Sequence, residues 1–216
     1  MAEKKEIALE KREAEAGRLF SPSSARNRQP IVDAFETLGL TEGRVLEIGS
    51  GTGEHAVALL KAYPGLSWTA SDPDTASRQS CRAWAVHENL QDRMDVREIN
   101  ILKPDWAEPL SGFDLIYCAN VIHISPVEVM KGILSHAPDI LTPAGHVVFY
   151  GPFRRNGVFH AEGNASFDVS LKQRDPSWGV RDLELDLIPE AGKNGLSLKR
   201  VLDMPANNTI VELSRA

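Results

Sequence analysis

The chain is poor in cysteine, in long apolar runs and in positive charge. Its 216 residues include 2 cysteines, and 30 aspartates and glutamates outnumber 24 lysines and arginines, for a formal net charge of -6. Cys81 and Cys118 offer neither a disulfide framework nor metal-ligand spacing, so we expect buried thiols, a reducing compartment and no metal site. An acidic chain repels phosphate backbones, which makes bulk nucleic-acid binding unlikely.

No apolar run approaches the roughly 20 residues of a membrane span, and the charged start of the chain lacks the apolar core of a secretory signal. A hydrophobic content of 42% at this length favours one globular domain. We therefore expect a cytoplasmic protein without a membrane partner. Residues 1–19 form a charged N-terminal arm, either helical or frayed, and residues 20–216 form the domain.

From residue 44 onward, apolar strand-like runs alternate with helical patterns. This alternation predicts an α/β fold, a Rossmann-like, doubly wound, seven-stranded and mostly parallel sheet that ends in a C-terminal antiparallel β-hairpin. Strands are expected over five early ranges and two hairpin ranges: 44–48, 66–71, 94–101, 113–118 and 145–150, then 196–204 and 209–213. Helices are expected over about 30–38 and 54–63, from Pro73, and after a capping box that begins at Ser125.

The strongest motif is the glycine loop after the first strand, in the run VLEIGSGTGEH at 45–55. Alternate glycines allow a sharp turn and close approach of a ligand, at the sheet edge where α/β proteins bind ligands. A phosphate-binding P-loop needs lysine where Glu54 stands, and a nucleophile elbow needs a different glycine spacing. A dinucleotide fingerprint remains an alternative, because residues 51–56 match it. Glu47 disfavours a pyrophosphate and suits a cationic ligand such as S-adenosylmethionine (SAM).

Seven segments occur in a characteristic order along the chain: SPSSARNRQPI, VLEIGSGTGEH, WTASDPD, ANVIHISP, YGPF, RDPSWGVRD and MPANN. Together they span about residues 21–213. This arrangement resembles class I SAM-dependent methyltransferases, and more closely the uncharacterised methyltransferase-like family that includes methyltransferase-like protein twenty-six. The resemblance implies the fold, SAM as cofactor and methyl transfer, and we expect a small polar acceptor molecule. It implies no oligomeric state.

Residues expected to contact the cofactor follow the ends of successive strands: Glu47, Gly49, Ser50, Gly51, Asp72, Asn100, Ile101 and Asn120. Asp72 is expected to accept hydrogen bonds from ribose hydroxyls, or alternatively to cap the helix that starts at Pro73. Asn100 and Ile101 correspond to the adenine contact, where related families often carry aspartate. Asn120 faces the methionine end or is only a turn residue. The resemblance also places the segment with Arg28 over the cofactor.

His123 lies just after the fourth strand, close to where the reactive methyl group is expected. A neutral imidazole there can take a proton from an acceptor, with a pKa in the ordinary histidine range. The alternative is a loop histidine that is hydrogen-bonded to the backbone.

The segment 151–191 is expected to be an insertion that covers the substrate. Arginines and aromatic residues alternate in it, so Tyr150, Arg154 and Arg174 are candidate substrate contacts for a polar or anionic molecule. In the alternative, its arginines pair with Asp168, Asp175 and Asp182.

Two other functions remain open. A SAM-binding module without catalysis, acting as a regulatory or scaffolding partner, shares the cofactor motif. A methyltransferase for proteins or nucleic acids is the third possibility, although the Asn/Asp-Pro-Pro-aromatic signature is replaced by Asn120-Val121-Ile122-His123.

Overall fold

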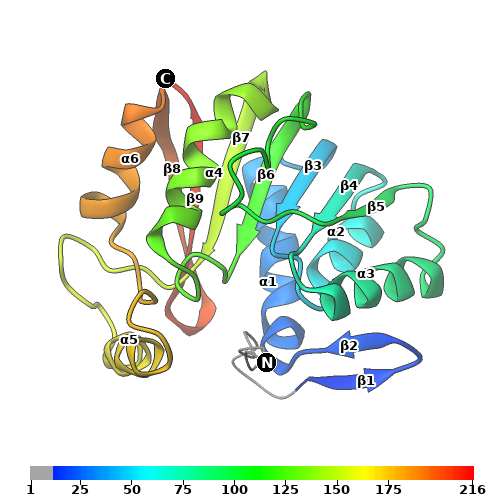
Figure 1. The fold of residues 1–216 in the computed structure, drawn as a ribbon, viewed down its shortest axis with the longest axis horizontal. Coiled ribbons are helices and arrows are strands. Elements are labelled where there is room, and N and C mark those ends of the chain that lie inside the picture. The colour runs from blue at the N-terminus through cyan, green and yellow to red at the C-terminus, as the bar shows by residue number, and fades with distance from the viewer. Residues whose placement is uncertain (1–11) are drawn as a thin grey trace.

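The computed structural model describes residues 12–216 (Figure 1). Its strands are β1 (Glu13–Glu15), β2 (Arg18–Phe20), β3 (Glu42–Ile48), β4 (Gly65–Ser71), β5 (Met94–Arg97), β6 (Phe113–Ala119), β7 (Leu141–Gly151), β8 (Leu196–Met204) and β9 (Asn208–Arg215). Its helices are α1 (Pro22–Leu38), α2 (Glu54–Ala62), α3 (Thr75–His87), α4 (Val127–Ile140), α5 (Glu162–Arg174) and α6 (Ile188–Lys193). A π-helical turn, Leu183–Leu187, precedes α6, and a short turn, Pro205–Asn207, joins β8 to β9.

The main sheet has seven strands in the order β5-β4-β3-β6-β7-β9-β8. The strands from β3 to β7 pair in parallel, and β9 runs antiparallel to both of its neighbours. This confirms the expected mostly parallel sheet with its C-terminal hairpin. The order reverses at β3 and β6, and ligands bind at such a switch point in open α/β sheets.

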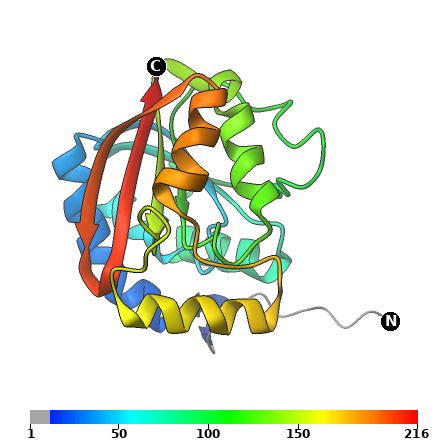
Figure 2. The ribbon, with the colours of Figure 1, turned by 90° about the vertical axis from the view of Figure 1, so that its left-hand side faces the viewer.

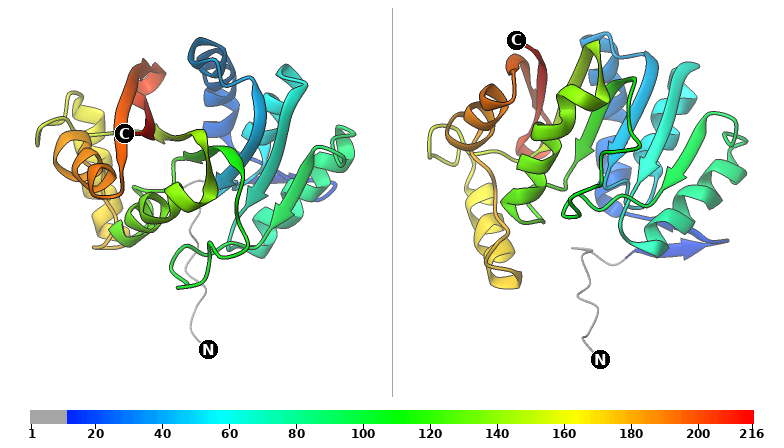
Figure 3. Two further views of the ribbon diagram at one scale, coloured as in Figure 1. Left: turned by 90° about the horizontal axis from the view of Figure 1, so that it is seen from above. Right: turned by 45° about the horizontal axis from the view of Figure 1, so that its top comes forward.

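Helices cover both faces of the sheet, as the views in Figure 3 show, and an apolar core lies against each face. Residues of α1, α2 and α3 pack with Trp68 and Tyr117 on one face, and residues of α4 and α6 pack with Ile116 and Phe149 on the other. Alternate residues of each strand therefore belong to opposite cores, which explains the continuous apolar runs of the parallel strands.

Helix α1 begins earlier than the expected residue 30. The Ser21 hydroxyl accepts a hydrogen bond from the Ser24 amide at 3.2 Å, and Pro22 occupies the first helical turn. Pro30 lies inside the helix and not at its start. The Ser-Pro pair is the stronger start signal, because it supplies both the cap and a preset backbone angle.

Three other expected boundaries were wrong. Helix α3 starts at Thr75 with Asp74 as its cap, so Pro73 lies outside it. Strand β5 ends at Arg97, because β4 pairs with it only over residues 94–97. The Ser125 hydroxyl donates to the Val121 carbonyl and caps nothing, so α4 begins without the expected capping box.

Residues 13–20 form the β1–β2 hairpin and not a helix. The hairpin is fixed to α3, because the Leu19 amide donates to the Ser80 hydroxyl at 2.8 Å and the Trp84 indole donates to the Leu19 carbonyl at 3.1 Å. The rest of the expected N-terminal arm, residues 1–11, lies outside the described residues.

The segment between β7 and β8 has two parts. Helix α5 lies across one end of the sheet, below the strands in Figure 2. Leu183, Leu187 and Ala191 instead pack into the core beside α4. Among the described residues, no helix combines the length and apolar character needed to cross a bilayer.

Gly53 provides a test of the turn from the glycine loop into α2. Its φ is +88°, and a Cβ added there would lie 3.1 Å from the Cys81 Cα. Gly53→Ala should therefore lower the free energy of unfolding by about 1–3 kcal/mol, as expected for a strained, crowded backbone position. Urea denaturation measures the change. Gly192→Ala is the matched control, because an added Cβ meets nothing within 4 Å and alanine favours the helix. Equal stabilities of the two variants would contradict this account of the turn.

Candidate active site

The glycine loop is held against the end of β4. The amides of Gly49 and Ser50 both donate to the Ser71 carbonyl, at 2.8 and 2.9 Å, and the Ser71 amide donates to the Ser50 hydroxyl at 2.9 Å. Gly49 has a φ of +74°, and an added Cβ would lie 2.4 Å from Val121 Cγ2. Only glycine fits here, because the loop lies directly against Val121, two residues after the end of β6.

Glu47 is a buried carboxylate with only 2% of its surface exposed. The Trp68 indole donates to it at 2.9 Å, and in the described part of the chain no lysine or arginine pairs with it. Burial raises the pKa of Glu47 to about 7. A cation beside this carboxylate would remove the cost of burying its charge.

Tyr117 adjoins Glu47, since the two residues are register partners on β6 and β3. Its ring packs edge-on against Phe35 and Trp68, with centroid distances of 5.3 and 5.9 Å. Its hydroxyl is buried without a hydrogen-bond partner among the described residues. Sequence reasoning missed Tyr117, because a tyrosine in an apolar strand is typical of a core residue.

Asp72 organises the glycine loop. Its carboxylate accepts hydrogen bonds from the Gly51 amide at 3.0 Å and the Asp74 amide at 2.8 Å. Burial raises its pKa, because desolvation outweighs these bonds. The alternative role of Asp72 as the cap of α3 was wrong, since Asp74 is the cap.

Arg12 also reaches this site, although the sequence indicated only a solvated arm there. Its guanidinium donates to the Ser77 hydroxyl at 3.2 Å and lies 3.5 Å from where a Cβ on Gly51 would be. Its charge opposes the rise in the pKa of Asp72. The β1–β2 hairpin delivers this side chain, and a charged run of sequence does not reveal such a long-range contact.

Asn100 and Ile101 lie in a turn beyond β5 and not at a strand end. The Asn100 side chain accepts a hydrogen bond from the Leu102 amide at 3.0 Å. Ile101 is 9% exposed and packs toward Gly132 of α4.

Asn120 and His123 follow β6 and meet the end of β7. The Asn120 amide donates to the Tyr150 carbonyl at 2.8 Å, and Asn120 has a φ of +58°. A Cβ on Gly151 would lie 3.2 Å from both the Nδ1 and Cε1 atoms of His123. The end of β7 thus brings Asn120, Tyr150 and His123 together, and Val121 joins them to Gly49.

His123 is 2% exposed, and its ring packs edge-on against Phe167 of α5 at 5.6 Å. Its Nδ1 atom is buried without a partner among the described residues. Burial, followed by the charge of Arg181, lowers the pKa of His123 to about 3. The expected pKa in the ordinary histidine range was therefore wrong, because the side chain is far more enclosed than a loop position indicates.

The arginines of the 151–191 segment are largely engaged by protein groups. Arg154 lies 3.6 Å from Asp186 and next to the Phe159 ring, and Arg155 bonds Glu184 at 2.5 Å. For these two arginines the alternative of ion pairing was thus correct, with Asp186 and Glu184 as the partners. Two of the expected acidic residues bind other groups: Asp168 pairs with Lys172, and Asp182 binds backbone amides.

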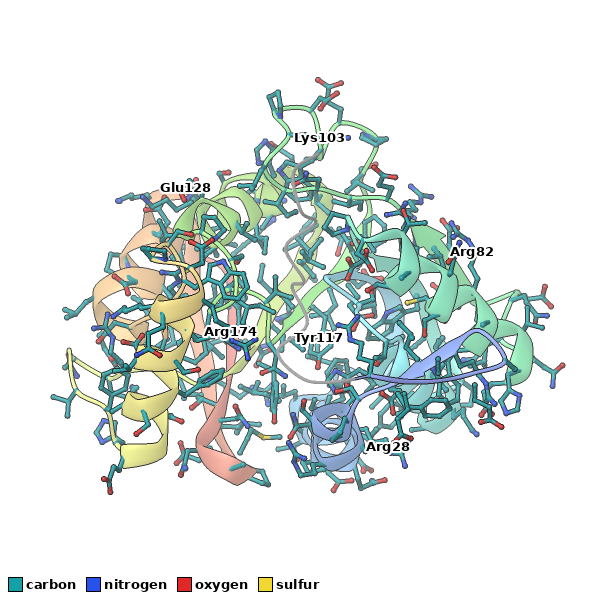
Figure 4. All side chains as sticks on the ribbon, turned by 60° about the horizontal axis from the view of Figure 1, so that its bottom comes forward. Arg28, Arg82, Lys103, Tyr117, Glu128 and Arg174 are labelled. Carbon is teal, nitrogen blue, oxygen red and sulfur yellow. The ribbon has the colours of Figure 1, made fainter. Side chains whose placement is uncertain are left out.

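The remaining candidates, Arg28, Arg174 and Tyr150, lie on α1, α5 and β7. Arg28 and Arg174 are exposed, and Figure 4 shows them on α1 and α5, on either side of Tyr117. Tyr150 is buried, which raises the pKa of its hydroxyl to about 12.

Comparison with known proteins agrees with this architecture. A profile of the family described as "Protein of unknown function (DUF938)" matches residues 18–215. The chain belongs to the DUF938 family. Among solved structures, the chain resembles the mitomycin 7-O-methyltransferase MmcR, with a TM-score of 0.77, 21% identity, and coverage of 90% of this chain and 54% of that one. It also resembles CalO1, a methyltransferase in calicheamicin biosynthesis determined with S-adenosylhomocysteine (SAH) bound, with a TM-score of 0.71, 19% identity, and coverage of 90% and 54%.

The chain also resembles two curated proteins that are much longer than it. The dual O-methyltransferase/FAD-dependent monooxygenase elcB of Phaeosphaeria nodorum is 27% identical over 132 residues, which are 59% of this chain and 14% of that protein. The O-methyltransferase gedA of Aspergillus terreus is 22% identical over 201 residues, or 84% of this chain and 41% of that protein. The chain thus spans less than half the length of these two relatives, and the comparisons establish a class I methyltransferase fold.

Proposed function

We propose that this chain is a SAM-dependent methyltransferase that acts on a hydroxyl group of a small molecule. The observation that carries the proposal is the unpartnered His123 nitrogen at the ligand-binding edge of the sheet. Val121, two residues before this histidine, lies against Gly49 of the glycine loop. The two curated relatives named above are O-methyltransferases, which favours oxygen as the acceptor atom.

The buried groups around the glycine loop fit SAM. Among the described residues, no lysine or arginine pairs with Glu47 and no group bonds the neighbouring Tyr117 hydroxyl, so both can serve a ligand with an ammonium group. When bound, SAM supplies a methyl group already activated on a positively charged sulfur. The residues proposed to hold it are Glu47 at the ammonium, the backbone of Gly49, Ser50 and Gly51, Asp72 at the ribose, Asn100 and Ile101 at the adenine, Asn120 at the methionine end, and Arg28 from α1.

His123 would orient the acceptor hydroxyl and accept its proton. With a pKa lowered to about 3, the imidazole is neutral throughout the physiological range and offers a lone pair at every working pH. Charging it is costly because it is enclosed beside Arg181, so proton transfer has to accompany methyl transfer and cannot precede it. The rate should consequently show no limb near pH 6.5 that belongs to His123.

The acceptor is proposed to be a mainly apolar molecule with a hydroxyl group, and α5 with its flanking loops to be its lid within residues 151–191. An apolar cluster of Leu171, Trp178 and Val180, with Ile124, Phe159 and Phe167 against it, lies beside His123. Arg154 is held by Asp186 and is less available to an anion than the sequence indicated. Tyr150 and Arg174 remain the proposed polar contacts.

The closer resemblance to the family of methyltransferase-like protein twenty-six is part of this proposal, supported by the seven segments of sequence. A cytoplasmic location is also proposed. It is supported by Cys81 and Cys118, which are buried, unpaired thiols whose pKa values burial raises.

Substitutions at Asp72 and Asp74 distinguish a role in ligand binding from a role in helix capping. Asp72→Ala should weaken SAM binding by about 1.5–3 kcal/mol, the range for hydrogen bonds to a charged group. Asp74→Ala, the matched control, removes the cap of α3 and should lower stability by about 0.5–2 kcal/mol with SAM affinity near wild type. Titration calorimetry and thermal melts distinguish the two. If Asp72→Ala binds SAM as tightly as Asp74→Ala, the ribose contact is wrong.

The function itself is tested by a screen of phenols, alcohols, carboxylic acids, amines and thiols, in which mass spectrometry follows SAH and methylated product. We expect O-methylated products. His123→Ala should lower their formation by ~10²-fold or more at unchanged SAM affinity, the scale of a positioned base. His87→Ala, on the exposed end of α3, is the control.

Full turnover by His123→Ala would contradict the role of the histidine. SAM binding without any methylated product would support the non-catalytic module instead, and methylation confined to proteins or nucleic acids would support the macromolecular enzyme.

A further inference from the structure

Two loops that are far apart in the sequence are bonded to each other around His123. The histidine turn, residues 122–125, receives hydrogen bonds from the clamp loop, residues 175–182. The Gly179 amide donates to the His123 carbonyl at 3.0 Å. Arg181 donates from Nε to the Ile122 carbonyl at 2.9 Å and from Nη2 to the Ser125 carbonyl at 2.5 Å.

Arg181 therefore bridges the carbonyls on both sides of the histidine. Its planar guanidinium presents donors in a fixed fork, so one side chain holds two acceptors at a set separation. Nη2 also donates to the Ser177 carbonyl at 3.1 Å, which ties the clamp loop to itself. In the described chain these contacts are with backbone carbonyls and not with a carboxylate. The hydrogen bonds of the arginine therefore depend on the backbone conformation of the turn.

The clamp loop is in turn fixed to α5. Asp168 is 5% exposed; one carboxylate oxygen accepts the Val180 amide at 2.8 Å, and the other accepts Lys172 at 2.6 Å. Gly179 has a φ of +156°, and an added Cβ would lie 2.9 Å from the Asp168 carboxylate. Phe167, the neighbour of Asp168, contacts the His123 ring itself. A continuous set of contacts thus runs from α5 through the clamp loop to the histidine.

We propose that Arg181 is a positioning residue that makes the orientation of His123 depend on docking of α5 and the clamp loop. This inference rests on the proposed function, in which His123 receives the acceptor hydroxyl. The histidine turn takes three hydrogen bonds from the clamp loop, and it loses all of them when the loop leaves to admit an acceptor. The base is then in place only over an enclosed substrate, where water cannot compete for the methyl group.

The first experiment observes the histidine directly and needs no acceptor. The protein is labelled with ¹³C-histidine and saturated with SAH, and the His123 ring signal is assigned by its loss in His123→Ala. Arg181→Met should move or broaden this signal and leave the other five histidines unchanged. The control is Arg155→Met, an arginine of the same segment that pairs with Glu184 away from the turn. An unmoved His123 signal in folded Arg181→Met overturns the proposal.

Arg181→Lys keeps the charge but carries all its donors on one nitrogen, so it cannot reproduce the contacts that arginine makes from Nε and Nη2 to two carbonyls. This variant takes the place of Arg181→Met in the experiment if Arg181→Met does not fold. Its His123 signal should also move, whereas a wild-type signal would show that charge alone matters and would overturn the positioning role.

The second experiment is a double-mutant cycle on a phenol that the screen shows to be methylated. Arg181→Met should lower kcat about tenfold or more with the KM for SAM unchanged, a part of the effect of removing the base. In the His123→Ala background the same change should have no further effect, because Arg181 acts only through the histidine. If the fold-changes in kcat of the two single variants instead multiply in the double variant, the proposal is overturned. If His123→Ala alone is fully active, the proposed function fails, while the histidine signal still decides whether Arg181 positions the ring.

Discussion

The site depends on one shared hydrogen-bond acceptor, the carbonyl oxygen of Ser71. Two successive amides of the glycine loop converge on it, and this bends the chain sharply at the end of β3. The bend places Gly51 against Asp72 and Gly49 under Val121. Both halves of the site are consequently set by one turn: the loop that would hold the cofactor and the histidine turn that would meet the acceptor.

Around this turn the protein keeps polar groups that it does not satisfy itself. The Glu47 carboxylate has no cation, and the Tyr117 hydroxyl and the His123 Nδ1 atom have no partner in the described chain. Each of the two groups without a hydrogen bond, the Tyr117 hydroxyl and the His123 Nδ1 atom, costs about 1–3 kcal/mol, which is large for a marginally stable domain. A ligand that supplies the missing partners would account for these residues, since functional sites are where sequences depart from the most stable choice.

The fold and the position of the glycine loop could be predicted from the sequence because their signals are local. Apolar periodicity located the strands, and the glycine spacing located the loop after β3. A helix start could not be predicted where several neighbouring residues can serve as the cap. Asp72, Pro73 and Asp74 all resemble helix starts, and α3 is capped by Asp74 because the Asp72 carboxylate is bonded to Gly51. Likewise, Ser125 has the spacing of a capping box, but its hydroxyl bonds back to Val121.

Contacts across the chain remained hidden for a related reason. Arg12 reaches Ser77 through a hairpin, and Arg181 reaches Ile122 through a loop, at sequence separations that no periodicity reports. The alternation of arginine and phenylalanine in the 151–191 segment resembled an anion site. The structure shows instead that the acidic residues of the same segment engage those arginines, and that the aromatic side chains gather near the histidine.

The central claim is that the site is built for a ligand whose cation replaces a missing partner of Glu47. With a pKa of about 7, Glu47 is mostly protonated at pH 6.5 in the free protein, and a bound ammonium group favours the carboxylate, so binding releases a proton. Calorimetric titration with SAM at pH 6.5, in buffers of different ionisation enthalpy, counts that proton. The account predicts a net release in the wild type that is absent in Glu47→Gln, with wild-type affinity rising as the pH passes through 7. The same proton exchange in both proteins would contradict it.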